Sequence, residues 1–162
     1  MATTAILTVV DASTIVACAG TANRGTPDKP LSLGSLNDPA SGRNCQASCI
    51  YMLSKAADAI QGQGTSELNV RAFQYDNLQW FNTTMQNELD YLVDFYKFQK
   101  LSGPDVFAPG QPANMGAYWQ ATIVNLAVNQ SITYNWCFKI TDKRNPSVVW
   151  YCYWDPYITL VG

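Results

Sequence analysis

The chain has 162 residues and a mass of 17.9 kDa, a length that predicts a single domain over residues 1–162. Charged residues make up only 14% of it and the net charge is −2, which excludes a charge-rich disordered chain and the basic surface of a nucleic-acid-binding protein. The absence of histidine excludes Ser-His and Cys-His dyads and removes the commonest metal ligand.

About eight segments are predicted to be β-strands, because they are rich in β-branched residues or alternate between polar and apolar ones. In chain order they cover residues 4–10, 49–54, 67–72, 78–82, 91–98, 118–128, 131–140 and 148–161. Only residues 56–60 and 85–89 have short helical patterns. Gly, Pro, Asn and Asp separate the strands, and the largest break is a long N-terminal loop over residues 19–44. The pattern predicts an all-β fold, a single-domain antiparallel β-sandwich that is jelly-roll-like or immunoglobulin-like.

The strongest alternation lies in residues 131–140. The predicted inner face consists of large apolar side chains: Ile132, Tyr134, Trp136, Phe138 and Ile140. Residues 67–72 alternate in the same way, with Leu68, Val70 and Ala72 facing inward. The last strand is long, and Pro156 is expected to bend it or to place it at a sheet edge.

The loop of the final hairpin determines which side chains lie outside. If the loop centres between Arg144 and Asn145, Cys137 lies opposite Cys152. The same register puts Trp150 and Trp154 on the outer face of the sheet. A slip or bulge would move both tryptophans inside.

The cysteines and the N-terminus indicate the compartment. The five cysteines are an odd number, and the N-terminus lacks the basic start of a secretory signal, so free thiols and a cytoplasmic protein are expected. No apolar stretch approaches the ~20 residues of a membrane span, so no membrane partner is predicted. Cys45 and Cys49 are four residues apart, but without a second close pair the sequence does not predict a zinc site, and the metal content is left unknown.

Several motifs resemble those of the AidA/PixA inclusion-body protein family. The central one is IQGQGTSELNV at residues 60–70, followed by Asp76 and Trp80. Before it lie Asp11 and Ile15 after the first strand, then Asn23, Pro27, Asp28 and Pro30, then Tyr51-Met52. After it come YWQAT at residues 118–122 and WDPYI at residues 154–158. The combination, in this order over nearly the whole chain, is specific although each fragment alone is weak. The loop between residues 28 and 51 is longer than the family's pattern.

The resemblance implies a small bacterial accessory protein linked to quorum sensing, host association or cytoplasmic inclusions. It also implies a protein that is not an enzyme, and some members look like calcium-dependent sugar-binding proteins. The leading hypothesis is therefore a non-catalytic protein, a lectin that binds glycans with calcium through its loops. The alternative is a structural or storage protein whose self-association, as a homo-oligomer, forms cytoplasmic inclusions. The low net charge of the chain favours that alternative, because copies of a weakly charged protein repel one another little and associate more easily.

An oxygen-rich loop is the first candidate ligand site. Its members are Asp28, Asn37, Asp38 and Asn44 in the long loop, with Asp155 at the end of a strand. Calcium takes ~6–8 oxygen ligands from carboxylates, amides and carbonyls, and a bound calcium ion can also hold two sugar hydroxyls. The competing interpretation is that each Asp or Asn caps its own turn.

Trp150 and Trp154 are the second candidate, because exposed aromatic rings stack on sugars or form protein interfaces. The competing interpretation is that tryptophans fill the core. A third possibility is catalysis by the closely spaced acids Glu88, Asp90 and Asp94. A solvated strand face explains these acids equally well, and without histidine no enzymatic activity is predicted.

Overall fold

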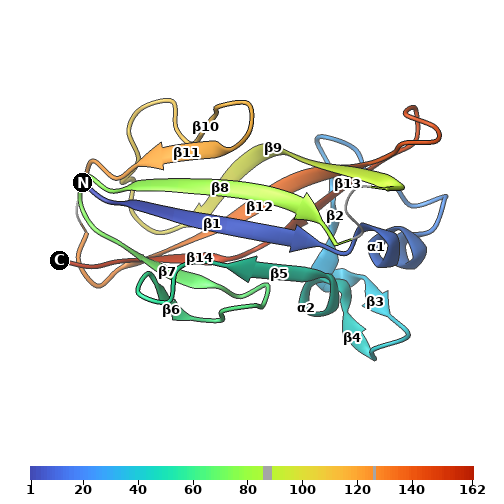
Figure 1. The fold of residues 1–162 in the computed structure, drawn as a ribbon, viewed down its shortest axis with the longest axis horizontal. Helices are drawn as coiled ribbons and strands as arrows, with labels where there is room; N and C mark the ends of the chain where they lie inside the picture. Colours follow the sequence, from blue (N-terminus) through green and yellow to red (C-terminus); the bar gives the residue numbers. More distant parts are fainter. Residues whose placement is uncertain (86–88, 126) are drawn as a thin grey trace.

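The computed structural model describes residues 1–85, 89–125 and 127–162, and its two main β-sheets overlie each other (Figure 1). The first sheet has the strand order β10 (Ala113–Asn114), β11 (Trp119–Thr122), β8 (Asn77–Thr84), β1 (Thr3–Val10) and β5 (Ile50–Leu53). The second has the order β2 (Leu31–Ser32), β13 (Val149–Trp154), β12 (Ser131–Asp142), β14 (Tyr157–Leu160), β7 (Asn69–Ala72) and β6 (Ala59–Gln61), with β9 (Tyr91–Ser102) paired to β12. The mainly β fold that the sequence predicts is confirmed.

The pairing is not wholly antiparallel, which corrects the predicted antiparallel sandwich. β1 runs parallel to β8 from the pair Thr3–Asn77 to the pair Val10–Thr84. β2 is parallel to β13, and β7 is parallel to β14. Alternation within one strand reports which face is buried but not which neighbour it pairs with, so a mixed sheet has the same local pattern as an antiparallel one.

β13 and β14 behave as one long strand along β12. Trp136 lies opposite Trp154, and Ile132 lies opposite Ile158, so the register continues across the interruption at Asp155 and Pro156. The backbone N–H of Tyr134 donates to the carbonyl of Pro156 (3.4 Å) within this stretch. The strand is interrupted at Asp155 and Pro156, but it does not lie at a sheet edge, because β14 has β12 on one side and β7 on the other.

The predicted register of the final hairpin is wrong by one residue. Ile140 pairs with Trp150, and Phe138, not Cys137, pairs with Cys152. The N–H of Asp142 donates to the carbonyl of Val148 (3.1 Å), so residues 143–147 form a loop one residue longer than expected. Since side chains alternate along a strand, this single residue turns Trp150 and Trp154 to the inner face.

The core between the sheets is rich in aromatic rings. The predicted inward face of β12 is confirmed, because its apolar residues from Ile132 to Ile140 are fully buried. Trp136 stacks on Phe95 (4.8 Å between centroids) and meets Trp80 of the other sheet edge-on (5.4 Å). One cluster of buried residues includes members of both sheets.

Two helices were not predicted. α1 (Ala12–Ala19) begins after Asp11, whose carboxylate accepts the N–H of Thr14 (3.1 Å) as an N-cap. α2 (Cys45–Cys49) begins after Asn44 in the same way. Both lie with the short strands β3 (Asn37–Asp38) and β4 (Arg43–Asn44) at the end of the molecule opposite the two termini (Figure 1).

The remaining segments also differ from expectation. The long loop contains β2, the 3₁₀ turn η1 (Leu33–Ser35) and the β3–β4 pair, so it is only partly irregular. Residues 56–58 form a turn that leads into β6, and the helix predicted over residues 56–60 is wrong. The centre of the helical pattern over residues 85–89 lies outside the described residues. Within the part of the chain that the structure describes, no helix is long and apolar enough to cross a membrane.

Candidate functional site

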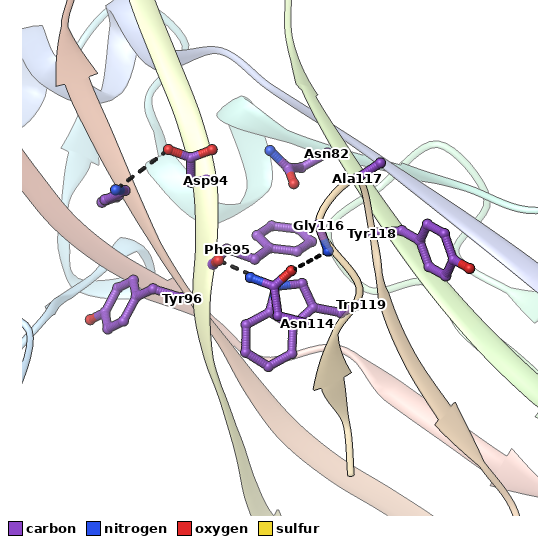
Figure 2. Close-up of a pocket in the computed structure, with 10 residues that line it drawn as sticks. Asn82, Asp94, Phe95, Tyr96, Asn114, Gly116, Ala117, Tyr118 and Trp119 are labelled. Atoms are coloured by element: carbon purple, nitrogen blue, oxygen red, sulfur yellow. Dashed lines mark hydrogen bonds and ion pairs between the residues drawn. The ribbon is translucent and has the colours of Figure 1, made fainter.

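A cleft of about 480 Å³ opens between β9 and the segment that leads into β11 (Figure 2). Its lining combines amide, carboxylate, ammonium and aromatic groups: Asn82, Asp94, Phe95, Tyr96, Asn114, Gly116, Ala117, Tyr118, Trp119 and Lys139. These residues come from β8, β9, β10, β11, β12 and the connection between β10 and β11.

The free edge of β9 explains how the cleft is built. Among the strands that the structure describes, β9 is paired only with β12, so carbonyl groups on its other edge need partners. The indole Nε1 of Trp119 donates to the carbonyl of Phe95 (3.3 Å), and the amide of Asn82 donates to the carbonyl of Val93. These two side chains tie the five-stranded sheet to β9, and Figure 2 shows the bond of Trp119 to Phe95 beside the cleft.

The rim of the cleft is polar. Lys139 and Asp94 form an ion pair (3.6 Å) with both side chains about two-fifths exposed. On the other side, the Oδ1 of Asn114 accepts the N–H of Gly116 (2.8 Å), which fixes a tight turn. Gly116 has φ +91, a backbone conformation that strongly favours glycine. The arrangement can hydrogen-bond and stack against a small neutral polar molecule.

The candidate residues of the long loop, Asp28, Asn37 and Asn44, do not converge on one site, and each lies in its own local structure. Asp28 is exposed beside the turn in which the N–H groups of Thr26 and Lys29 donate to each other's carbonyls. Asn37 is exposed, and Asn44 caps α2 by accepting the N–H of Ala47 (2.9 Å). The competing interpretation of the sequence, that such residues cap turns, therefore holds for Asn44.

Asp38 is buried and satisfied within its own turn. Its carboxylate accepts the N–H of Ala40 (3.0 Å). The hydroxyl of Ser41 is the main group that holds the pKa of Asp38 below its usual value, with the Ala40 N–H adding to the effect. No group of three or more His, Cys, Asp or Glu residues is placed to hold a metal ion in residues 1–85, 89–125 and 127–162.

Asp155 lies near Glu67, because both carboxylates accept hydrogen bonds from one amide group. The sequence did not indicate that these two acids meet. The amide of Gln46 in α2 donates to Asp155 (2.6 Å) and to Glu67 (2.7 Å). The Glu67 carboxylate raises the pKa of the nearby Tyr157 hydroxyl, and burial and Asp155 add to this.

The tryptophans predicted to bind a ligand are core residues. Trp150 is 3% exposed and Trp154 is fully buried, so the prediction that both lie on the outer face is wrong. The indole N–H of Trp150 donates to the carbonyl of Gly20 (3.0 Å), and that of Trp154 donates to the sulfur of Met52 (3.3 Å). The slipped hairpin register is the physical reason.

The acids considered for catalysis are used in surface ion pairs. Asp90 pairs with Arg144 (3.1 Å), and Asp94 pairs with Lys139 at the rim of the cleft. Glu88 lies outside the described residues. Sequence reasoning missed Asn82 and Asn114 of the cleft, since no local pattern joins residues this far apart. Trp119 belongs to the YWQAT motif at residues 118–122, and the sequence assigned it no ligand-binding role.

Comparisons with known proteins agree with the resemblance seen in the sequence. The family model described as "PixA: Inclusion body protein" matches residues 2–117. The fold is similar to the crystal structure of an inclusion body protein (PixA) from Burkholderia cenocepacia J2315, with a TM-score of 0.76 and 17% identity over 99% of this chain and 95% of that one. No curated protein matches the chain significantly. The chain belongs to the PixA inclusion body protein family.

Proposed function

We propose that this protein is a non-catalytic, self-associating protein that assembles into cytoplasmic inclusions. We further propose that its copies meet through the outer face of the five-stranded sheet. The observation that carries the proposal is the absence of charge on that sheet. None of the residues in β1, β5, β8, β10 and β11 is Asp, Glu, Lys or Arg. Packing two such faces together removes no charge from water.

An apolar row crosses the middle of this face. Leu7 of β1 lies opposite Leu53 of β5 on one side and opposite Phe81 of β8 on the other. The ring of Phe81 contacts that of Tyr118 (5.2 Å between centroids). Leu7 and Leu53 are 37% and 41% exposed. A contiguous apolar row on an uncharged sheet is typical of a protein contact surface.

The edge strands of both sheets are partly covered. Two copies are therefore expected to meet through their sheet faces and not by pairing one edge strand with another. On the outer side of β5, the N–H of Met52 donates to the carbonyl of Thr65 (3.1 Å), which occupies part of that edge. The free edge of β9 is held by Trp119 and Asn82. Occupied edges are a common defence against strand-by-strand aggregation. The family description, inclusion body protein, also supports self-association.

The test compares exposed leucines on the two sheets. Leu7→Lys and Leu53→Lys place charges on the proposed contact face, whereas Leu101→Lys in β9 is a matched control on the other sheet, where Leu101 is 50% exposed. The fraction of protein in sedimentable inclusions is measured in bacterial cells that express each variant. We expect the double variant to remain in the supernatant and the control to sediment like the unmodified chain.

Two results would contradict the proposal. Equal sedimentation of all three proteins would exclude this face. Inclusions that return no native β-type circular dichroism when they are dissolved without denaturant would show misfolding instead of assembly.

A second candidate function is glycan binding in the cleft. Trp119 with the amides of Asn82 and Asn114 supports it, because sugars are held by an aromatic ring and paired hydrogen bonds. Among the described lining residues Asp94 is the only carboxylate, so binding there is expected to persist in EDTA. A glycan array with and without calcium tests this, with Asn114→Ala as the variant. Calcium-dependent retention that survives Asn114→Ala would instead favour the loop site around Asp28 and Asp38. Control by quorum sensing stays a prediction of the resemblance.

A further inference from the structure

A second hollow, of about 400 Å³, lies between α1 and the β3–β4 pair. It is lined by small and mainly apolar residues: Ser13, Thr14, Ala17, Cys18, Asp38, Pro39 and Ala40. Cys18, in the last turn of α1, is half-buried, whereas the four other cysteines of the chain are buried. The hollow therefore gives small solutes access to the Cys18 thiol.

Two buried thiols, those of Cys45 and Cys49, lie in the neighbouring helix α2. α1 packs against α2, and the Cys18 and Cys49 thiols lie close enough to that of Cys45 to add to the rise of its pKa, of which burial is the main cause. Main-chain hydrogen bonds hold both ends of α2 in place. The N–H of Asp11 donates to the carbonyl of Cys49 (2.8 Å), and the N–H of Cys45 donates to the carbonyl of Leu36 (2.8 Å). The thiols at positions 18, 45 and 49 are thus held together by the fold.

Cys45 and Cys49 differ from Cys18 in their accessibility to solvent. Burial raises the pKa of Cys49 to about 11, and burial is also the main cause of the raised pKa of Cys45. Both are therefore protonated at neutral pH, and both are buried, so a dissolved oxidant does not reach them before Cys18. The accessible member of the cluster, Cys18, is the one that a solute meets first.

We propose that Cys18 is a peroxide-sensitive site and that Cys45 resolves it as an intramolecular disulfide. Hydrogen peroxide transfers one oxygen to the Cys18 sulfur, which gives a sulfenic acid and one water. The Cys45 sulfur then displaces the sulfenic hydroxyl, which leaves as a second water with the Cys45 proton. The two sulfurs each lose one electron, and the O–O bond of the peroxide accepts both. The disulfide would tie the end of α1 to the start of α2.

The remaining cysteines supply an internal control. Cys152 lies on the inner face of β13, whereas Cys137 lies opposite Tyr153 on the other face of the sheet. Side chains on opposite faces of a sheet cannot form a disulfide. Cys137→Ser with Cys152→Ser should therefore leave the proposed reaction unchanged.

The test is peptide mapping of the folded chain after treatment with hydrogen peroxide. Trypsin separates the cysteines, because residues 1–24 contain only Cys18 and residues 44–55 contain only Cys45 and Cys49. We expect these two peptides to be cross-linked, with a loss of about 2 Da for the two thiol hydrogens. Cys49→Ser should keep the cross-link. Cys45→Ser should lose it and leave a Cys18 sulfenic acid that dimedone traps.

Other outcomes overturn the proposal. A bond within residues 44–55, a cross-link that survives Cys45→Ser, or disulfide-linked dimers through Cys18 would each assign the chemistry elsewhere. Unchanged thiols after peroxide treatment would show that Cys18 is inert. The cross-link in the unmodified chain decides the question even if a variant fails to fold.

Discussion

The two sheets share one core but differ in what their faces contribute. The seven-stranded sheet supplies most of the large buried rings, with Trp136, Trp150 and Trp154 on adjacent strands. Apart from Trp80, the five-stranded sheet supplies smaller buried side chains, and three of its buried residues, Thr4, Thr8 and Thr84, are polar. The outer faces of the two sheets differ as well, in their charge.

The outer face of the seven-stranded sheet is charged: it includes Arg71, Asp94, Lys97 and Lys139. The outer face of the five-stranded sheet has no charged residue. Large aromatic packing and an uncharged outer surface are thus divided between the two sheets. We expect aromatic packing in the seven-stranded sheet to dominate stability, and the uncharged sheet is the one proposed for contact between copies.

Trp136→Ala should have the largest effect on stability. Trp136 is fully buried and contacts rings from both sheets, so its truncation leaves a cavity that neither sheet can fill. We expect a loss of ~3–5 kcal/mol in the free energy of unfolding, measured by urea denaturation. A loss below ~1 kcal/mol would contradict the dominance of the aromatic sheet.

Asp11→Ala tests the helix that extends from the end of β1. The carboxylate of Asp11 accepts both the N–H (3.1 Å) and the hydroxyl (2.8 Å) of Thr14. Loss of this N-cap should cost ~1–2 kcal/mol in denaturant unfolding, and Asp11→Asn should recover most of it. If Asp11→Asn is as unstable as Asp11→Ala, the cap is not the source of the effect.

Thr8→Val tests the polar inner face of the five-stranded sheet. The hydroxyl of Thr8 is buried and has no hydrogen-bond partner among the described residues. Replacing it with an isosteric methyl group should stabilise the fold by about 1 kcal/mol, seen as a higher melting temperature. A destabilised variant would indicate that the hydroxyl holds a buried water molecule.

Lys139→Met should have the smallest effect. The ion pair of Lys139 with Asp94 is about 40% exposed at each side chain, and exposed pairs contribute little. We expect a change below ~1 kcal/mol in urea denaturation. A larger loss would mean that the charges of this face are part of the stability of the sheet.

Much of the fold follows from local patterns, but its long-range pairing does not. The alternation of residues 131–140 was sufficient to identify the buried face of β12, because burial follows a period of two. The register of the hairpin after it depends on one residue in the loop around Asn145, and no alternation reports that length. The parallel pairing of β1 with β8 is equally invisible, because it joins strands that are distant in sequence.

The candidate site was harder to predict for the same reason. The cleft is made by side chains from β8, β9, β12 and the segment from β10 to β11. Asn82 and Trp119 matter there because they donate to carbonyls on the outer edge of β9. The polar residues that the sequence does group, such as Asp38 and Asn44, are used by their own turns. α1 was detectable from Asp11, because an aspartate directly after the first predicted strand is a favoured N-cap residue.

Sedimentation velocity on purified protein over a range of concentrations tests the central claim most directly. The account predicts that the unmodified chain and Leu101→Lys shift to larger species as concentration rises, whereas Leu7→Lys with Leu53→Lys stays monomeric with unchanged circular dichroism. A monomeric unmodified chain at every concentration, or assembly that is indifferent to charges at Leu7 and Leu53, would contradict it.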